Sequence, residues 1–331
     1  MRLVLLPVLV GTLLTVQPSA PAKALAADLV AHYDAHDYDR FTADFGRVTS
    51  FADISSALFD RATPLKLAIL NTQRRRLVLA AVSLELVARY GVANRTNALM
   101  LLWKMDELVR LSRPGPIEQT WYWADVAMLE ALGDGGQVEL HAEHGLARFP
   151  GDPHLVLARA IGAELRTFPE PRGVTLKDDP DNATLAISRF KQALAYDAIR
   201  AEANLRIGVT LVRLDRARDA LPYLARVKDA TTDPYLLYLS ALFTGRAAEQ
   251  LHRMDDAIQS YREACRIVPG QAAAFGLATA LARAGQRAEA ARVSEQFVTM
   301  PSATGDPWTA YGSADARFLE SILTSLREAL R

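Results

Sequence analysis

Residues 245 to 269 read GRAAEQLHRMDDAIQSYREACRIVP, two amphipathic stretches separated by a polar turn. The small residue Gly245 lies in the first stretch, and the small residue Ala257 follows it twelve positions later in the second. Tyr261 stands four positions after Ala257, and Pro269 ends the stretch, as proline does where a chain leaves a helix. Small residues on facing helices let two backbones approach closely, and a larger side chain one turn on fills the remaining gap. The segment therefore predicts a pair of antiparallel helices.

The same spacing recurs in the neighbouring sequence. Gly208 is followed by Ala220, and Ala278 is followed by Ala290, in each case at twelve positions and across a polar turn. A single helix pair cannot bury its own apolar face, so successive pairs must stack on one another. The recurrence therefore predicts an all-α chain built as an α-solenoid. The alternative is an unrelated helical bundle, which three recurrences of one spacing disfavour.

This pattern resembles the tetratricopeptide repeat (TPR) family, whose unit is a helix-turn-helix pair of about 34 residues. The positions that carry the resemblance are Gly208, Ala220, Gly245, Ala257, Tyr261, Ala264, Pro269, Ala278 and Ala290. The distance from Ala220 to Ala257 is 37 residues, so we expect an extended loop between those two repeats. No tryptophan occupies the expected early position of the clear repeats, so the ligand specificity of known family branches cannot be transferred.

The resemblance also implies a binding surface, because the first helices of successive TPR pairs line a concave groove. The residues that it places in the groove are Leu205, Val209, Arg213, Leu242, Arg246, Glu249, Phe275, Thr279 and Arg283. This mixture of apolar and scattered charged side chains suits an extended or helical peptide segment better than a nucleic acid. The expected partner is therefore a protein or peptide.

Four regions are predicted along the chain. They are a signal peptide over 1–24, an irregular helical region or degenerate repeats over 25–112, TPR-like repeats over 113–301, and a capping helix within 302–331. The repeats are expected to contain an inserted loop at 167–182, a stretch with three prolines and a glycine.

Helical periodicity gives bounds for some individual elements. In the irregular region it predicts helices over Leu65–Tyr90, ended by Gly91, and over about Thr96–Leu111. Near the C-terminus it predicts a helix over Ser313–Leu330. We expect this last helix to cover the final repeat and to solvate its outer face.

The N-terminus has the pattern of a secretory signal peptide. Met1-Arg2 is basic, Leu3 to Val16 is almost wholly apolar, and Ala22-Lys23-Ala24 supplies a small-x-small cleavage pattern. The apolar run is shorter than the about 20 residues that span a bilayer. We therefore expect an exported protein without a stable membrane anchor after cleavage, periplasmic or envelope-bound in a Gram-negative source and otherwise secreted. The alternatives are an uncleaved anchor and a buried helix.

Composition excludes several classes of protein. The chain has 331 residues, with 38 basic side chains, 38 acidic side chains and one cysteine. A formal net charge of zero argues against a nucleic-acid binder that works through bulk electrostatics. A single cysteine excludes an intramolecular disulfide and a cysteine-based zinc cluster. Half of the residues are apolar, so a disordered chain is not expected.

Short motifs typical of catalysis are absent from the sequence, which contains no GxxxxGK(S/T), GxGxxG, GxSxG or HExxH. His141 and His144 on a predicted helix supply only two metal ligands, too few for a stable site. Cys265 lies on the inward half of a predicted repeat helix, where packing is its expected role. We therefore expect no catalysis, no cofactor and no metal ion.

Three successive arginines, Arg74 to Arg76, make a dense positive patch in the irregular region. The patch can be interpreted as a docking site for an acidic partner or for lipid headgroups. It can equally be interpreted as a solvated helix face, since the neighbouring positions are apolar.

Together these patterns predict an exported, non-catalytic interaction module or scaffold in the cell envelope. One alternative is an enzyme, or a metal- or sugar-binding protein, with a site between the N-terminal helices and the loop at 167–182. Such a site would join Trp121, Trp123, His141 or His144 to several buried carboxylates in one pocket. The other alternative is a structural component of an envelope assembly.

Overall fold

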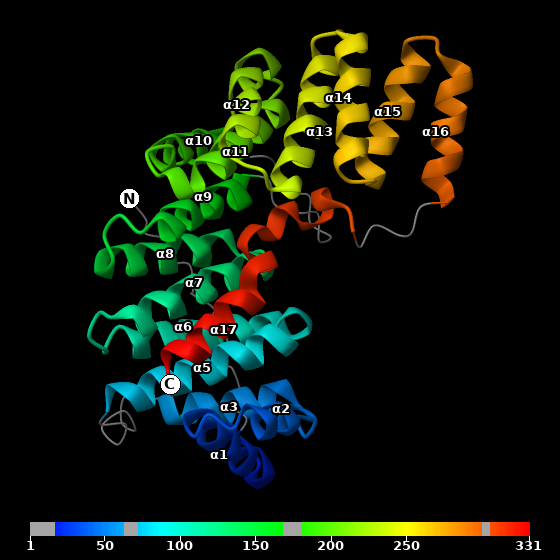
Figure 1. The fold of residues 1–331 in the computed structure, drawn as a ribbon. Helices are drawn as coiled ribbons and strands as arrows, with labels where there is room; N and C mark the ends of the chain where they lie inside the picture. The colour runs from blue at the N-terminus through cyan, green and yellow to red at the C-terminus, as the bar shows by residue number, and fades with distance from the viewer. Residues whose placement is uncertain (1–16, 63–71, 168–179, 300–304) are drawn as a thin grey trace, which may run out of the picture. The chain divides into compact units, whose positions relative to one another are not determined.

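The computed structural model describes residues 17–62, 72–167, 180–299 and 305–331, and every regular element in these ranges is helical (Figure 1). The chain forms two compact units. Unit 1 contains Met1–Glu118 and Ser325–Arg331, and unit 2 contains Gln119–Thr324. The predicted core of the signal peptide, Leu3 to Val16, lies outside the described residues.

Unit 1 is built around one buried helix. Its helices are α1 (Ala20–Asp34), α2 (Tyr38–Phe45), α3 (Phe51–Ala62), α5 (Gln73–Tyr90), the 3-10 turn η1 (Val92–Asn94) and α6 (Arg95–Val109). Every residue of α5 from Leu77 to Val87 is buried. One of them is Glu85, which pairs with Arg327 near the C-terminus at 2.6 Å between Oε1 and Nε. The partner is needed because a buried carboxylate is stable only when it is paired or neutralised.

The end of α5 agrees with the predicted helix end. Gly91 follows the helix as its C-cap, with a right-handed φ of −64°. A Cβ added there would lie 2.5 Å from the Val87 carbonyl oxygen, so the glycine serves close approach and not a left-handed turn. The predicted start of this helix at Leu65 falls outside the described residues.

The arginine patch is engaged within unit 1. Arg74 pairs with Asp34 at 2.9 Å and donates a hydrogen bond to the Leu330 carbonyl oxygen at 2.7 Å. Arg76 donates to the Leu111 carbonyl oxygen at 3.1 Å. These two side chains therefore hold elements of unit 1 together, although Arg74 and Arg75 are exposed, as expected of a solvated helix face.

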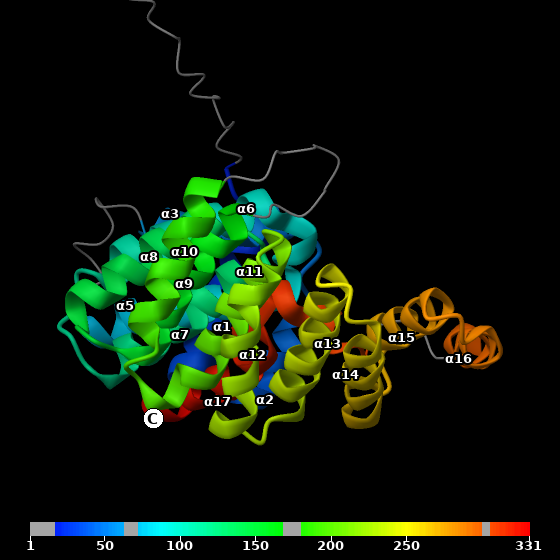
Figure 2. The same cartoon turned by 90° about the horizontal axis from the view of Figure 1, so that it is seen from above.

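Unit 2 is a series of helices that pack in chain order. They are α7 (Pro116–Ala131), which begins in unit 1, α8 (Gly135–Arg148), α9 (Pro153–Thr167), α10 (Pro180–Ala193), η2 (Asp197–Ile199), α11 (Arg200–Arg213), α12 (Ala217–Ala230), α13 (Pro234–Gln250), α14 (Met254–Ile267), α15 (Gln271–Arg283), α16 (Arg287–Thr299), the 3-10 segment η3 (Pro307–Phe318) and α17 (Leu319–Ala329), which ends in unit 1. From α8 to α16 each helix packs on its neighbours in sequence (Figures 1 and 2). Unit 2 thus has the all-α, solenoid arrangement of helix-turn-helix repeats that the TPR resemblance implies.

The small residues of the repeats lie where paired helices touch. A Cβ added to Gly208 of α11 would lie 2.5 Å from Leu224 of α12, and one added to Gly245 of α13 would lie 2.6 Å from the Tyr261 ring of α14. Ala220 and Ala257 have no exposed surface. Backbone approach at these positions leaves no room for larger side chains.

The C-terminal segment follows a different course from the expected one. The predicted helix over Ser313–Leu330 divides into the end of η3 and α17. Instead of covering the outer face of the last repeat, residues 306–317 contact α9, α11, α13 and the first turn of α15. The exposed face of α16 includes Arg287 and Arg292.

Two further sequence predictions concern an inserted loop and the signal-peptide cleavage site. The loop predicted at 167–182 falls mostly on residues 168–179, outside those ranges, between the end of α9 and the start of α10. The predicted cleavage bond after Ala24 lies inside α1, whose N-cap Ser19 also donates its hydroxyl to Asp53 at 2.6 Å.

Among the described residues no single helix is long and apolar enough to cross a membrane. Only α5 and the following Val92–Val109 meet the length and composition together, across a bend of 92°.

Candidate binding face on the helical repeats

The first helices of three successive repeats present one face to the C-terminal segment. We call this the inner face and define it by Glu164 of α9, Arg206 of α11, and Tyr238, Phe243 and Arg246 of α13. Figure 2 shows the red and orange C-terminal segment beside α11 and α13. The inner face therefore already holds an irregular stretch of chain.

A buried ion network lies at the centre of the inner face. The Arg206 guanidinium, of which 1% is exposed, pairs with Glu164 at 2.5 Å and with Glu202 at 3.0 Å. It also donates to the Tyr311 carbonyl oxygen at 3.3 Å, and the Tyr311 hydroxyl donates to Glu164 at 2.5 Å. Burial alone disfavours the charged guanidinium, but Glu164, Tyr311 and Glu202 together raise the pKa of Arg206 well above its usual value. Arg206 is therefore a permanent cation that ties α9, α11 and the C-terminal segment together.

The C-terminal end of the segment adds a second ion pair group. Arg317 pairs with Asp233 at 3.0 Å and with Glu202 at 3.4 Å, and its guanidinium lies 3.9 Å from the Tyr235 ring centre. Glu202 thus accepts hydrogen bonds from Arg206 of the inner face and from Arg317 of the segment. One carboxylate therefore links the inner face to the segment.

A carboxylate of the segment is recognised at its other end. Asp306 accepts hydrogen bonds from the Tyr238 hydroxyl at 3.0 Å and from the Ala272 backbone amide at 2.7 Å. Burial and the charge of Asp306 both raise the pKa of Tyr238, which stays a neutral donor. The same carboxylate accepts from the Trp308 amide at 2.9 Å and so fixes the turn into η3.

Arg246 lies at the edge of the contact. Its guanidinium carbon is 4.6 Å from the Phe243 ring centre and 4.9 Å from the Trp308 ring centre, both within cation–π range. Burial lowers the pKa of Arg246. Among the described residues this half-buried guanidinium finds no hydrogen-bond acceptor, so its N–H donors are left to solvent or to a ligand.

Arg246 also lines an open hollow of about 430 Å³ beside the segment. The hollow is lined by Val212, Arg213, Asp215, Phe243, Arg246, Glu249, Gln250 and Arg283. Glu249 accepts from the Tyr261 hydroxyl at 2.5 Å and pairs with Arg283 at 3.1 Å. The hollow therefore carries three guanidinium groups and two carboxylates, and the second carboxylate, Asp215, accepts a hydrogen bond from the Gln250 side-chain amide at 3.2 Å.

The nine predicted groove residues divide into three sets. Four of them, Arg213, Arg246, Glu249 and Arg283, line the hollow just described. Phe275 and Thr279 join Arg283 along a second hollow of about 540 Å³ between α15 and α16, where Phe275 is 63% exposed.

The other three, Leu205, Val209 and Leu242, line neither hollow, and at most 1% of each side chain is exposed. All of α11 from Ala201 to Val212 is buried, since the C-terminal segment covers a face that an isolated repeat would leave open. On α11 the side chain that meets the segment is Arg206, one position from the predicted Leu205.

Glu164, Arg206, Asp306, Trp308 and Tyr311 were missed by the sequence prediction. A signal exists for two of them, because Glu164 and Arg206 are charged residues in largely apolar helical runs. Charges in such positions are buried and paired, or they are neutralised. Nothing local in the sequence marks the segment residues that complete the network.

Residues proposed for the alternative site enter separate contacts. The Trp123 indole N–H donates to Asp152 at 3.0 Å, and Asp152 caps α9 through the Leu155 amide. His141 instead contacts Asp125 at 2.6 Å, with both side chains fully buried. Within the described ranges no group of three or more His, Cys, Asp or Glu side chains is placed to hold a metal ion.

Cys265 is a half-buried thiol on α14. Burial, with a smaller effect of Asp306, raises the pKa of Cys265 to about 11. The thiol is therefore protonated at neutral pH and a poor nucleophile.

No protein-family model matches this sequence, and a search of curated proteins found no match. Solved structures of MamA resemble part of the chain. MamA 41-end from Desulfovibrio magneticus RS-1 is 16% identical with a TM-score of 0.43, and the match covers 56% of this chain and 95% of that one. For MamA MSR-1 the values are 18%, 0.40, 55% and 95%. Both sequence identities and both TM-scores are low.

Proposed function

We propose that this protein is an exported, non-catalytic interaction module of the cell envelope, which binds an acidic peptide segment of a partner protein in the hollow beside Arg246. The observation that supports this proposal most directly is the contact between the inner face and residues 306–317. The same helices that line the hollow hold an irregular segment through an arginine, a tyrosine hydroxyl and aromatic stacking. A face that recognises one such segment has the chemistry to extend the recognition to a second.

The unsatisfied donors of Arg246 favour a carboxylate as the anchor of that second segment. A half-buried guanidinium without an acceptor loses hydration that nothing replaces. A carboxylate can accept two parallel N–H bonds from it in a fork arrangement, which is stronger and more specific than a bond to a neutral group. The aromatic rings of Phe243 and Trp308 hold the guanidinium plane in place for this contact.

The charges around the hollow also favour an acidic partner segment. Arg213, Arg246 and Arg283 share it with two carboxylates, Asp215 and Glu249, and Glu249 is engaged by Tyr261 and Arg283. The lining is therefore positive by one charge, although the whole chain has no net charge. An acidic segment is attracted and an equally basic one repelled.

Export is proposed on the N-terminal pattern. The basic start, the apolar run from Leu3 to Val16 and the small residues around Ala24 together have the order of a secretory signal. A single cysteine with a raised pKa is compatible with an oxidising compartment, since the chain needs no thiol chemistry there.

The test is affinity capture with the full chain. Purified wild-type protein and the variant Arg246→Glu with Arg283→Glu are each used to capture proteins from the envelope of the native source, followed by quantitative mass spectrometry. We expect the double variant to keep its helicity and to lose at least about tenfold of the specific partner, because two attractive contacts become repulsive.

Arg292→Glu on the exposed face of α16 is the matched control for charge reversal. It should recover the partner at the wild-type yield. Equal recovery by the double variant and the wild-type protein would show that the hollow beside Arg246 is not the binding site.

A further inference from the structure

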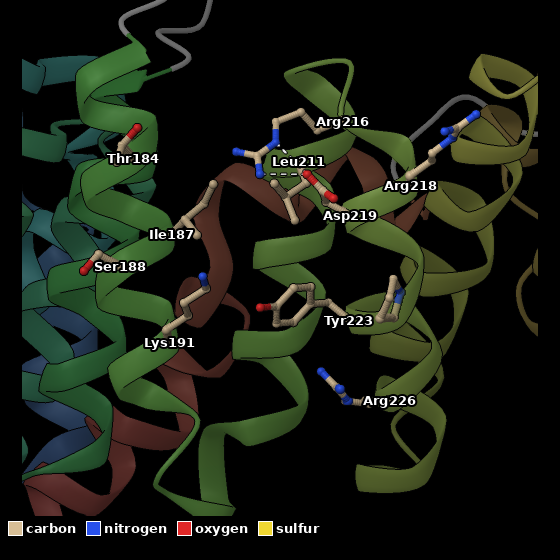
Figure 3. Close-up of a pocket in the computed structure, with 11 residues that line it drawn as sticks. Thr184, Ile187, Ser188, Lys191, Leu211, Arg216, Arg218, Asp219, Tyr223 and Arg226 are labelled. Atoms are coloured by element: carbon tan, nitrogen blue, oxygen red, sulfur yellow. Dashed lines mark hydrogen bonds and ion pairs between the residues drawn. The ribbon is translucent and has the colours of Figure 1, made fainter.

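A third hollow lies between α10 and α12 of unit 2, and the function proposed above does not use it. Its volume is about 600 Å³. Figure 3 shows its lining side chains, which come from α10, from the end of α11, from the turn before α12 and from α12 itself. They are Thr184, Ile187, Ser188, Lys191, Leu211, Arg216, Arg218, Asp219, Pro222, Tyr223 and Arg226.

The charges of this hollow are one-sided. Four cationic side chains, Lys191, Arg216, Arg218 and Arg226, line it together with a single carboxylate, Asp219. This excess occurs in a chain whose 38 basic and 38 acidic residues balance. The cations come from two different helices and a turn, so they do not form a simple stripe along one solvated helix (Figure 3).

The one carboxylate is already committed. Asp219 pairs with Arg216 at 2.7 Å, and the pair is drawn as a dashed contact in Figure 3. Arg226 has only a cation–π contact, with its guanidinium carbon 5.5 Å from the Tyr223 ring centre. Within the described ranges Lys191 and Arg218 have no acidic partner. Three positive charges of the hollow are therefore not neutralised by the protein.

Like charges that line one hollow repel one another, most strongly at low salt. The lining positions on α12 run from Arg218 to Arg226, eight residues, or about 12 Å along a helix. The Debye length at physiological ionic strength is about 8 Å, so the repulsion between the two ends of this row is largely screened there and is strongest at low salt. An anionic occupant removes this repulsion, which gives a favourable free energy of binding that no neutral occupant gains.

The lining of the hollow also contains apolar side chains and hydroxyl groups. Ile187, Leu211 and Tyr223 are buried or half-buried, and they offer apolar surface between the cations. Thr184 and Ser188 add exposed hydroxyl groups along α10. Pro222 also lacks the N–H that would bond to the Arg218 carbonyl oxygen, so α12 is missing one helical hydrogen bond beside the hollow.

We propose that this hollow is a second docking site, specific for an acidic peptide segment that carries an apolar side chain between its carboxylates. The apolar side chain packs on Ile187 and Tyr223, and the flanking carboxylates pair with Lys191, Arg218 and Arg226. A space of about 600 Å³ suits a few residues of peptide and greatly exceeds a single inorganic phosphate. The protein then has two separate acidic-segment sites and joins two partners.

The probe is a fluorescent peptide of about ten residues, with glutamates on both sides of one central leucine. Its binding to the full chain is followed by fluorescence anisotropy at low and at physiological salt. We expect binding that weakens as salt rises, and Lys191→Glu with Arg218→Glu should reduce the affinity at least about tenfold. The same peptide with lysines in place of glutamates should not bind.

Three variants test whether the peptide binds at this hollow. Arg292→Glu reverses one exposed charge outside the hollow, and it should leave the affinity unchanged. The Lys191→Glu with Arg218→Glu reversal is also measured in a protein that carries Arg246→Glu with Arg283→Glu, so that binding of the peptide at the inner face is removed, and the further loss of affinity should still be at least about tenfold. If the double charge reversal fails to fold, Lys191→Gln with Arg218→Gln removes the charges without introducing repulsion and should still weaken binding.

Three results would overturn the proposal. The first is equal affinity of the wild-type protein and of the variants at Lys191 and Arg218. The second is absence of peptide binding to the wild-type protein. The third is binding to vesicles of anionic phospholipid, lost in the same variants, without binding to the peptide, which would make the hollow a lipid contact.

Discussion

Single residues decide how closely the helices of a repeat approach. Gly208 and Gly245 both lie where a Cβ would enter the side chain of the next helix, on Leu224 in one repeat and on Tyr261 in the other. The partner differs, but the geometry is the same, because a bulky side chain from the second helix fills the space that the glycine leaves open. Both positions were identified from the twelve-residue spacing alone.

We predict that Gly208→Leu lowers the free energy of unfolding by about 1–3 kcal/mol through overpacking. An added Cβ already lies 2.5 Å from the Leu224 side chain, so a leucine at this position forces both helices to shift. Chemical denaturation of both proteins, monitored by circular dichroism, measures the difference. Ala288→Leu, at an exposed position of α16, is the control and should leave the midpoint unchanged. Equal midpoints for Gly208→Leu and the wild-type protein would contradict the packing described here.

At the scale of elements, helices that depend on local sequence were predictable, whereas a segment that depends on long-range contacts was not. The helix pair α13 and α14 has its turn, small residues and proline within about 35 residues of sequence, and its existence was predictable. The course of η3 was not, because the Tyr311 hydroxyl meets Glu164 across 147 positions of sequence. A 3-10 helix of twelve residues is also unusually long, and such runs depend on tertiary contacts rather than on propensity.

The same distinction explains the candidate site. Arg213, Arg246, Glu249 and Arg283 were predicted from the resemblance and lie together along one hollow. Leu205 and Leu242 were predicted from the same register but are buried. Periodicity identifies which side chains share a helix face, whereas a distant segment that covers this face is invisible to it.

We predict that Tyr311→Phe with Trp308→Ala loosens the C-terminal segment from the inner face. The double variant loses the hydroxyl bond to Glu164 and the ring contacts with Phe243, and a lost bond to a charged group alone costs about 1–3 kcal/mol. Limited trypsin digestion should then cut after Arg317 about tenfold faster than in the wild-type protein, as measured by mass spectrometry. Tyr90→Phe in unit 1 loses a comparable hydroxyl bond, to the Phe45 carbonyl oxygen, and should not change cleavage at Arg317. Unchanged cleavage in the double variant would mean that other contacts hold the segment.

At the scale of the whole molecule, the distribution of charge relates to the two proposed sites. Unit 2 places unneutralised cations at two hollows, although the full chain is balanced at 38 basic and 38 acidic residues. Removal of residues 1–24 takes away Arg2 and Lys23 and no acid, which leaves 36 basic against 38 acidic side chains. If both proposals hold, a slightly acidic mature chain with two cationic hollows would direct acidic partners to those hollows and away from the rest of its surface.

The last prediction concerns the mature N-terminus. Cleavage after Ala24 would remove Ser19, the N-cap of α1, together with its bonds to Asp53, while Leu25, Ala26 and Leu29 keep their buried positions. Loss of such a cap costs about 1 kcal/mol, which a helix with this buried face can tolerate. We therefore expect intact-mass and N-terminal peptide analysis of the protein from its native envelope to show Leu25 as the first residue. An Ala24→Arg variant should block processing and leave the precursor, since the cleavage pattern needs a small residue there. A protein that retains Met1, or that fractionates with the cytosol, would contradict export.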